Sequence, residues 1–213
     1  SSTTANIMAS VSNGLYVGGL VGSDNGSTII NSYATGNIIA SSTSYISVGG
    51  LVGSNNGTLT DNYATGNIVA NSTSGSIEVG GLIGHCSTGS SSTSSGVISK
   101  NYATGDIEAT SESGSIYVGG LIGDQYYAAT EQSYATGNIV ANSTSGTVCA
   151  GGLAGRGSER NKSYATGDID VKTEIGEINV GGLSGTLWNK SYTRIATDAF
   201  SVGAVTAIST SGN

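Results

Sequence analysis

The fold is decided by two stretches, Tyr63-Ala64-Thr65-Gly66-Asn67-Ile68 and Gly80-Gly81-Leu82-Ile83-Gly84. Equivalents of the first stretch occur at 32–37, 102–106, 133–138 and 163–168. Gly-Gly-Leu occurs six times, with its leucine at Leu20, Leu51, Leu82, Leu121, Leu153 and Leu183. Successive leucines are 31, 31, 39, 32 and 30 residues apart, so one unit of about 30 residues is repeated. The chain is therefore a repeat array, in which equivalent side chains form columns.

Within one unit, strand-like stretches alternate with turn chemistry, and no window shows a helical period. Ile77 and Val79 share one face of a strand, which we expect to be interior together with the leucine column. The column of Glu78 points the other way, and we expect it to face solvent; it holds Tyr16, Ser47, Glu78, Tyr117, Cys149 and Asn179. The Gly-Gly pair indicates a bend or bulge that needs positive φ or close backbone approach.

These patterns predict an all-β fold, a parallel β-solenoid (β-helix) of about six coils, with its handedness left open. Six coils would stand ~29 Å tall at ~4.8 Å each. We expect a single repeat domain over residues 1–213, with an insertion loop at about 85–100 and an atypical terminal coil at about 186–213. Whether the Ser72 to Gly75 turn joins two sides of a coil or tips a protruding hairpin stays open at this point.

Composition argues against several classes of function. The net charge is −7 and no basic residue precedes Lys100, so the clustered Lys and Arg needed to bind nucleic acid are missing. No apolar stretch approaches the length of a membrane span. Cys86 and Cys149 lie two repeats apart at different points of the unit, which predicts two free thiols.

Residues for catalysis are sparse as well. His85 is the single histidine, and its side chain and that of Cys86 should lie on opposite sides of one strand, against a Cys-His nucleophile pair. We expect no catalytic residues, no metal site and no cofactor. The carboxylate pairs Asp106 with Glu108 and Asp168 with Asp170 are interpreted as surface decoration.

The chain resembles the GLUG repeat through Val17-Gly18-Gly19-Leu20-Val21-Gly22 followed by Asn31-Ser32-Tyr33-Ala34-Thr35-Gly36. This repeat occurs in bacterial surface proteins, including adhesins and non-catalytic regions of some immunoglobulin A peptidases. The resemblance covers roughly Gly18 to Gly185, in units longer than the GLUG spacing. It implies an exported, β-helical surface segment. It implies no peptidase activity, because no His-Glu-x-x-His motif is present.

Alternation along the repeated strand places Ala34, Gly36 and Ile38 on the interior face and exposes three columns. These are the Tyr column (Tyr33, Tyr63, Tyr102, Tyr134, Tyr164), the Thr column (Thr35, Thr65, Thr104, Thr136, Thr166) and the Asn column (Asn37, Asn67, Asp106, Asn138, Asp168). One interpretation is that the columns are ladders that stabilise the stack. The other is a flat binding face for a glycan, ice or another protein. The opposite parity, with Tyr and Thr inside, stays open.

We therefore expect a non-catalytic extracellular or cell-surface structural or adhesion module. The alternatives are an ice-binding protein that uses the Thr and Asn columns, and a polysaccharide-binding or polysaccharide-active β-helix. Expected partners are a glycan or surface ligand, and a second copy of the chain. Self-association would use the end coils, since Asn6-Ile7-Met8-Ala9 and Phe200 to Val205 are degenerate copies of the repeated strand and neither end carries proline or a charge run.

Overall fold

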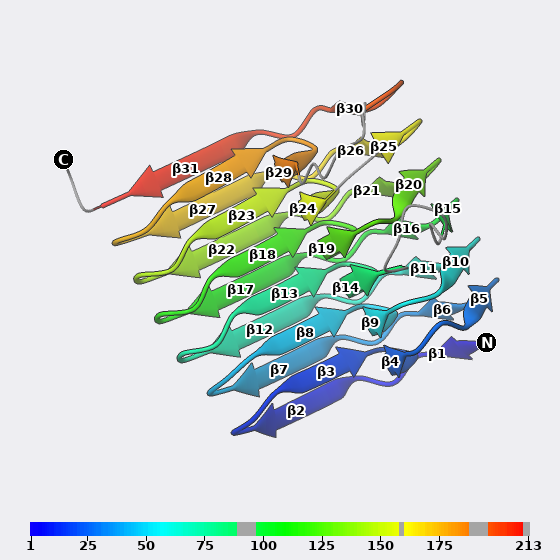
Figure 1. The fold of residues 1–213 in the computed structure, drawn as a ribbon, viewed down its shortest axis with the longest axis horizontal. Coiled ribbons are helices and arrows are strands. Elements are labelled where there is room, and N and C mark those ends of the chain that lie inside the picture. The colour runs from blue at the N-terminus through cyan, green and yellow to red at the C-terminus, as the bar shows by residue number, and fades with distance from the viewer. Residues whose placement is uncertain (89–96, 158–159, 188–195, 211–213) are drawn as a thin grey trace.

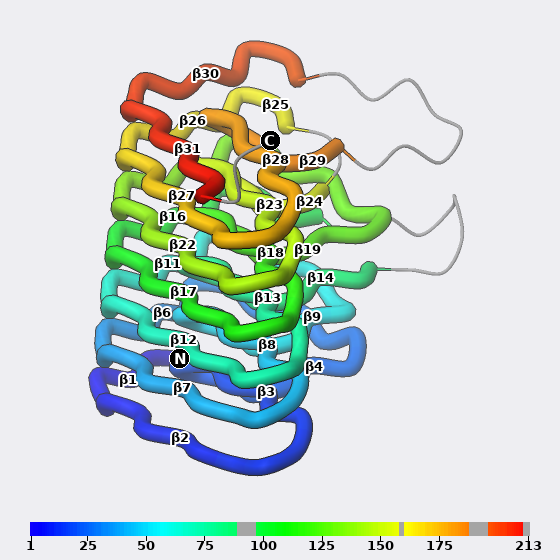
Figure 2. Tube along the Cα trace, turned by 90° about the vertical axis from the view of Figure 1, so that its left-hand side faces the viewer, coloured from blue at the N-terminus to red at the C-terminus, as the bar shows by residue number. Residues whose placement is uncertain are grey.

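The computed structural model describes residues 1–88, 97–157, 160–187 and 196–210. Its strands stack along one axis from the N-terminal end to the C-terminal end (Figures 1 and 2). Every pairing among the described strands is parallel. A complete coil adds one strand to each of five sheets, which we name A to E in the order in which the coil visits them. The predicted parallel β-solenoid of about six coils is confirmed.

Sheets A and B hold the repeated Tyr-Ala-Thr-Gly-Asn-Ile stretch. Sheet A contains β1 (Ser2–Thr3), β6 (Tyr33–Ala34), β11 (Tyr63–Ala64), β16 (Tyr102–Ala103), β21 (Tyr134–Ala135), β26 (Tyr164–Ala165) and β30 (Phe200–Ser201). Sheet B contains β2 (Ile7–Val11), β7 (Ile38–Ser42), β12 (Ile68–Ser72), β17 (Ile107–Ser111), β22 (Ile139–Ser143), β27 (Ile169–Thr173) and β31 (Val205–Ser209). The degenerate copies near both ends thus pair as the sequence predicts, with Ile7 opposite Ile38 and Phe200 opposite Tyr164.

Sheets C, D and E complete each coil. Sheet C contains β3 (Leu15–Gly18), β8 (Ile46–Gly49), β13 (Ile77–Gly80), β18 (Ile116–Gly119), β23 (Val148–Gly151) and β28 (Ile178–Gly181). Sheet D contains β4 (Val21–Asp24), β9 (Val52–Asn55), β14 (Ile83–Ser87), β19 (Ile122–Tyr126), β24 (Ala154–Gly157) and β29 (Ser184–Leu187). Sheet E contains β5 (Thr28–Ile30), β10 (Thr58–Thr60), β15 (Val97–Ser99), β20 (Ala129–Glu131) and β25 (Arg160–Asn161).

Parts of the two irregular regions predicted from the sequence form strands, so both regions are shorter than predicted. β14 extends to Ser87 and β15 begins at Val97, so both ends of the predicted insertion loop at 85–100 are strand. The rest of that loop, 89–96, lies outside the described residues. In the predicted terminal coil, β29 ends at Leu187, and β30 and β31 follow at 200–201 and 205–209, whereas 188–195 and 211–213 lie outside the described residues.

The coil encloses two cores that meet at the Gly-Gly pair. Between sheets B and C pack columns such as that of Ile38, Ile68 and Ile107. Between sheets A, D and E pack the leucines of Gly-Gly-Leu together with the alanines of sheet A. The four innermost leucines, from Leu51 to Leu153, are at most 1% exposed, which confirms the predicted interior leucine column. The turn from Ser72 to Gly75 joins sheet B to sheet C, two sides of the same coil.

Close approach, and not positive φ, explains the Gly-Gly pair. A Cβ on Gly81 would lie 2.1 Å from the carbonyl oxygen of Gly120 in the next coil and 2.7 Å from the Cβ of Ala103 across the interior. Among the described glycines, the left-handed region is occupied by Gly26, with φ of 98°. The coil is therefore pinched at this point, where only a hydrogen fits.

The Glu78 column was predicted to face solvent, and this is wrong for three of its six members, which are buried. Ser47 is 0%, Glu78 7% and Cys149 4% exposed, while Tyr16 at the N-terminal end is 50% exposed. These side chains do point away from the core of sheets B and C. After the Gly-Gly bend, however, sheet D returns beside sheet C, and Ser47 Oγ donates to the carbonyl of Gly53 at 2.8 Å. We call this outer angle between sheets C and D the C/D corner.

Candidate functional site

The three predicted columns lie on the outer surface of sheet A and the segment leading into sheet B. In the second coil Ala34, Gly36 and Ile38 are buried, Thr35 and Asn37 are exposed, and Tyr33 is half-buried; the later coils repeat this pattern closely. The parity predicted from small side chains is thus confirmed, and the opposite parity is excluded. The fifteen residues come together as three parallel columns, each member one coil from the next.

The Tyr column is a continuous aromatic stack. Ring centroids of consecutive members are 4.8, 4.9, 5.0 and 4.9 Å apart, with interplanar angles of 2–4°. Phe200 extends the stack on Tyr164 at 5.2 Å. Each inner ring is covered on both faces by its neighbours, so the stack presents ring edges and hydroxyls to a ligand. A sugar ring that needs an exposed aromatic face would not find one between Tyr33 and Phe200.

The Asn column is a ladder of side-chain acceptors. Asn67 accepts at Oδ1 from the backbone N–H of Asp106 at 2.9 Å, and Asp106 accepts at Oδ1 from the N–H of Asn138 at 2.8 Å. The same kind of hydrogen bond links each coil to the next, from Asn6 Oδ1 at one end of the column to the backbone N–H of Ala204 at the other. Each bond uses only an acceptor oxygen, so Asn and Asp serve equally.

A second, buried ladder lies where sheet E turns into sheet A. Asn62 Oδ1 accepts from the backbone N–H of Ser32 at 2.9 Å. Asn101 Oδ1 in turn accepts from the backbone N–H of Asn62, also at 2.9 Å. The residue before each rung has left-handed φ, as at Asp61 with 56° and Lys100 with 55°. This ladder was not predicted from the sequence. Its signal is that the residue immediately before each repeated Tyr is always Ser or Asn.

Two shallow grooves follow the turn after sheet B, beside the predicted face. The first has a volume of about 300 Å³ and the second of about 290 Å³, and both reach Thr110. Their lining is dominated by hydroxyl and amide side chains from successive coils, such as Ser41, Asn71, Asn142 and Thr173. Together the grooves run along the solenoid axis on a polar surface that sequence reasoning did not single out.

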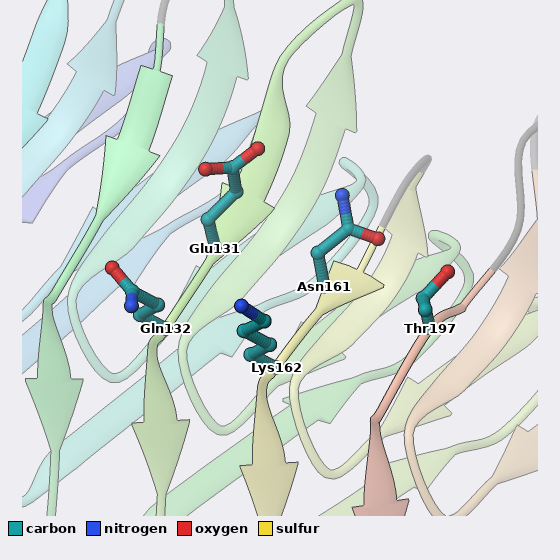
Figure 3. Close-up of a pocket in the computed structure, with 5 residues that line it drawn as sticks. All are labelled: Glu131, Gln132, Asn161, Lys162 and Thr197. Carbon is teal, nitrogen blue, oxygen red and sulfur yellow. The ribbon is translucent and has the colours of Figure 1, made fainter.

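A third groove, of about 400 Å³, lies over the turns at the C-terminal end of sheet E (Figure 3). Glu131, Asn161 and Thr197 project side by side from neighbouring coils, where they are opposite one another in register. Gln132 and Lys162 complete the lining. The mixed charges and open shape suit weak polar contacts and bring no nucleophile and base together.

The C/D corner holds a cluster of charged and aromatic side chains that the sequence analysis missed. Glu78 Oε2 accepts from Tyr45 OH at 2.6 Å and lies 2.8 Å from His85 Nδ1. Asp124, fully buried, is opposite His85 in register and accepts two hydrogen bonds from Arg156, one from Nε at 2.8 Å. These residues come from four successive coils.

Aromatic rings cover the cluster. The Arg156 guanidinium lies over the ring of Tyr117, with 4.2 Å from Cζ to the centroid, and it also faces Tyr126 at 5.1 Å. His85 packs against Tyr126 with ring centroids 5.7 Å apart. Cation–π contacts of this kind strengthen as the cation loses water. The Arg156 guanidinium is therefore held by two aromatic rings as well as by its hydrogen bonds to Asp124.

Burial and the two carboxylates set the ionisation of the cluster. Burial opposes a charged His85, but the hydrogen bond and negative charge of Glu78 and the charge of Asp124 outweigh it and raise the pKa of His85. Burial and then Glu78 raise the pKa of Tyr45, so its hydroxyl stays a donor. Burial and then Asp124 raise the pKa of Tyr126 to about 12.

The remaining titratable residues considered in the sequence lie apart from this cluster or inside the core. Both cysteines are free and buried, as predicted. Burial raises the pKa of the Cys86 thiol to about 12, which keeps it protonated near neutral pH. Of the carboxylate pairs, Asp106 is a rung of the Asn column and Asp170 forms an ion pair of 3.1 Å with Lys172.

Comparison with known proteins identifies the motif. A family model described as the GLUG motif matches residues 13–39, a segment that spans sheets C, D, E and A of the first two coils. No curated protein and no solved structure gives a significant match. The residues of the matched segment recur in structural register in the later coils, as Val48, Val79 and Val118 do opposite one another. The chain is therefore a β-solenoid repeat protein with the GLUG motif.

Proposed function

We propose that this chain is a non-catalytic structural module, a rigid spacer or adhesion segment at a cell surface or outside the cell. The observation that carries the proposal is that the repeated side chains make contacts between neighbouring coils. The stacked Tyr rings and the Asn ladder are engaged with neighbouring coils, and both run the length of the stack. Such columns hold neighbouring coils at a fixed distance and so maintain the shape and length that a spacer requires.

Two further observations support this proposal. Cys86 is held as a thiol, and the grooves among the described residues bring together hydroxyls and amides in place of a nucleophile with its base. The surface location rests on the resemblance of the repeats to bacterial surface proteins. The described residues contain no helix with the length and apolar character of a membrane span.

Antibody labelling of intact and permeabilised source cells tests the location. Labelling of intact cells is expected, and labelling only after permeabilisation would contradict the proposal. A product assay on a panel of polysaccharides tests the absence of catalysis, since release of oligosaccharides by the purified chain would make it an enzyme.

A second candidate function is binding of a neutral glycan along the polar grooves after sheet B. Hydroxyl and amide groups from successive coils match the hydrogen-bonding groups of an uncharged polysaccharide, and the grooves run along the axis as an extended polymer would. A glycan array tests this. Replacing Asn71 by Ala should weaken binding, whereas replacing Thr65 on the Thr column should leave it unchanged.

The exposed Thr column favours ice binding as a further alternative. Thr35, Thr65 and Thr104 are exposed on consecutive coils of a regular face. Thermal hysteresis in micromolar protein would support this alternative, and its absence would remove it.

End-to-end association stays a prediction. The outermost strands of the described stack present exposed apolar side chains, Phe200 at 54% and Val205 at 44%. Electron microscopy of the purified chain is expected to show fibres if these edges pair with another copy. Discrete particles at all concentrations would contradict that association.

A further inference from the structure

Within the C/D corner cluster, Glu78 and His85 belong to the same coil, on β13 and β14. In sheet C the position of Glu78 is held by Ser47 one coil earlier, and in sheet D the position of His85 is held by Ser54. The strands pair in the same register with either set of residues. The stack therefore does not require Glu78 and His85, and their joint appearance in one repeat calls for another explanation.

Charge in the cluster is unevenly compensated. Glu78 and Asp124 are both buried, at 7% and 0% exposure. Arg156 pairs with Asp124, while Glu78 Oε2 faces a neutral hydroxyl, that of Tyr45, and the imidazole of His85. When His85 is neutral, Arg156 is the charged partner described here for the two buried carboxylates, so a cation that takes the place of the proton between His85 and Glu78 would balance the second negative charge.

Donor atoms for such a charge are already grouped. One ligand atom each from Glu78, His85 and Asp124 lies within 4.8 Å of the other two. Zinc binds imidazole nitrogen and carboxylate oxygen at ~2.0–2.2 Å, which places its ligand atoms roughly 3–4 Å from one another. The 2.8 Å between Glu78 Oε2 and His85 Nδ1 is close to that range. His85 is 23% exposed, so an ion can reach the site from solvent.

We propose that His85 Nδ1 and the carboxylates of Glu78 and Asp124 bind a divalent transition-metal ion, for which Zn²⁺ best matches the donor set. A water molecule completes a four-coordinate shell. The metal takes the lone pair of Nδ1, so the proton between His85 and Glu78 leaves that position. From a charged imidazole it goes to solvent, and in a neutral ring it moves to Nε2. The Tyr45 hydroxyl keeps its hydrogen bond to Glu78 and orients the carboxylate.

The test uses the full chain after dialysis against a chelator, titrated with Zn²⁺ by calorimetry. We expect one ion per chain. The variants His85→Ser and Glu78→Ser each import the residue that the preceding coil carries in that column, so the fold should persist. Each is expected to weaken binding at least about tenfold, because a ligand is lost. Circular dichroism of both variants checks that the coils are intact.

Two controls separate this site from the thiols. Cys149→Ser and Cys86→Ser should leave Zn²⁺ affinity within about twofold, and Co²⁺ substituted for Zn²⁺ should show no thiolate-to-metal charge-transfer absorption. Absence of binding in the wild-type chain would overturn the proposal. A Zn²⁺ affinity in His85→Ser or Glu78→Ser equal to that of wild type would also overturn it, as would loss of binding in a cysteine variant.

Discussion

Replacing Gly81 by Ala should destabilise the whole stack, although only a methyl group is added. The new Cβ would lie 2.1 Å from the Gly120 carbonyl oxygen and 2.7 Å from Ala103 Cβ. Ordinary contact begins near ~3.5 Å, so adjacent coils would have to separate by more than about 1 Å. The backbone bonds that flank the site, from Gly81 N–H to Gly119 at 3.3 Å and from Leu82 N–H to Leu121 at 2.9 Å, would then weaken.

The expected loss follows from these two effects. Overpacking costs ~1–3 kcal/mol, and each weakened hydrogen bond about 1 kcal/mol. We therefore expect the free energy of unfolding to fall by about 3–5 kcal/mol. Adding Ala103→Gly should recover part of this loss, since it removes the side-chain contact and leaves the contact with the backbone.

Urea unfolding followed by far-ultraviolet circular dichroism measures the effect. Gly14→Ala is the matched control, because no atom lies within 4 Å of the added Cβ. Its stability should stay within about 0.5 kcal/mol of wild type. Equal stability of the Gly81→Ala variant and wild type would refute the claim that coils are pinched together at this glycine.

Substitutions at three other positions test the core, the Asn column and the Tyr column. Leu82→Asp should cost several kcal/mol, because it buries an unpaired charge at a position with 0% exposure, and an unchanged melting temperature would place Leu82 outside the core. Asp106→Asn keeps the acceptor for the Asn138 N–H and should leave the free energy of unfolding unchanged. Asp106→Ala removes this acceptor and should cost about 0.5–1.5 kcal/mol in urea unfolding. Equal effects of the two substitutions would show that the hydrogen bond in the Asn column does not stabilise the stack. Tyr102→Phe keeps the ring and should leave the melting temperature unchanged. Tyr102→Ala removes the ring from its two stacking partners and should lower the free energy of unfolding by about 1–3 kcal/mol. A cost for Phe equal to that for Ala would show that the hydroxyl matters more than the ring.

The sequence predicted what depends on alternation and spacing. Small side chains at Ala34 and Gly36 indicated which face of the repeated strand lies inside. The spacing of Gly-Gly-Leu predicted the length of one coil and the number of coils. The exposed Tyr, Thr and Asn columns followed from that parity. Their use as a binding face is untested, and the structure shows what two of them contribute, namely ring stacking and acceptor oxygens between coils.

What alternation cannot supply is the packing on the outer side of a strand. Glu78 points away from the core, as predicted, yet it is buried because the bend at Gly80 and Gly81 brings sheet D beside sheet C. That angle depends on contacts between segments distant in the sequence. The cluster of Glu78, His85 and Asp124 was missed for the same reason. Its sequence signal is that Ser47 and Ser54 are replaced by Glu78 and His85 in the same repeat.

The acceptor ladder of the Asn column has a consequence for chemical ageing. Asn37, Asn67 and Asn138 each use Oδ1 and leave their amide nitrogen outside the ladder bond. Deamidation that yields aspartate removes that nitrogen and keeps the oxygen, as Asp106 and Asp168 already demonstrate. Long-lived copies of the protein would thus become more acidic along one stripe while their coils kept the same register.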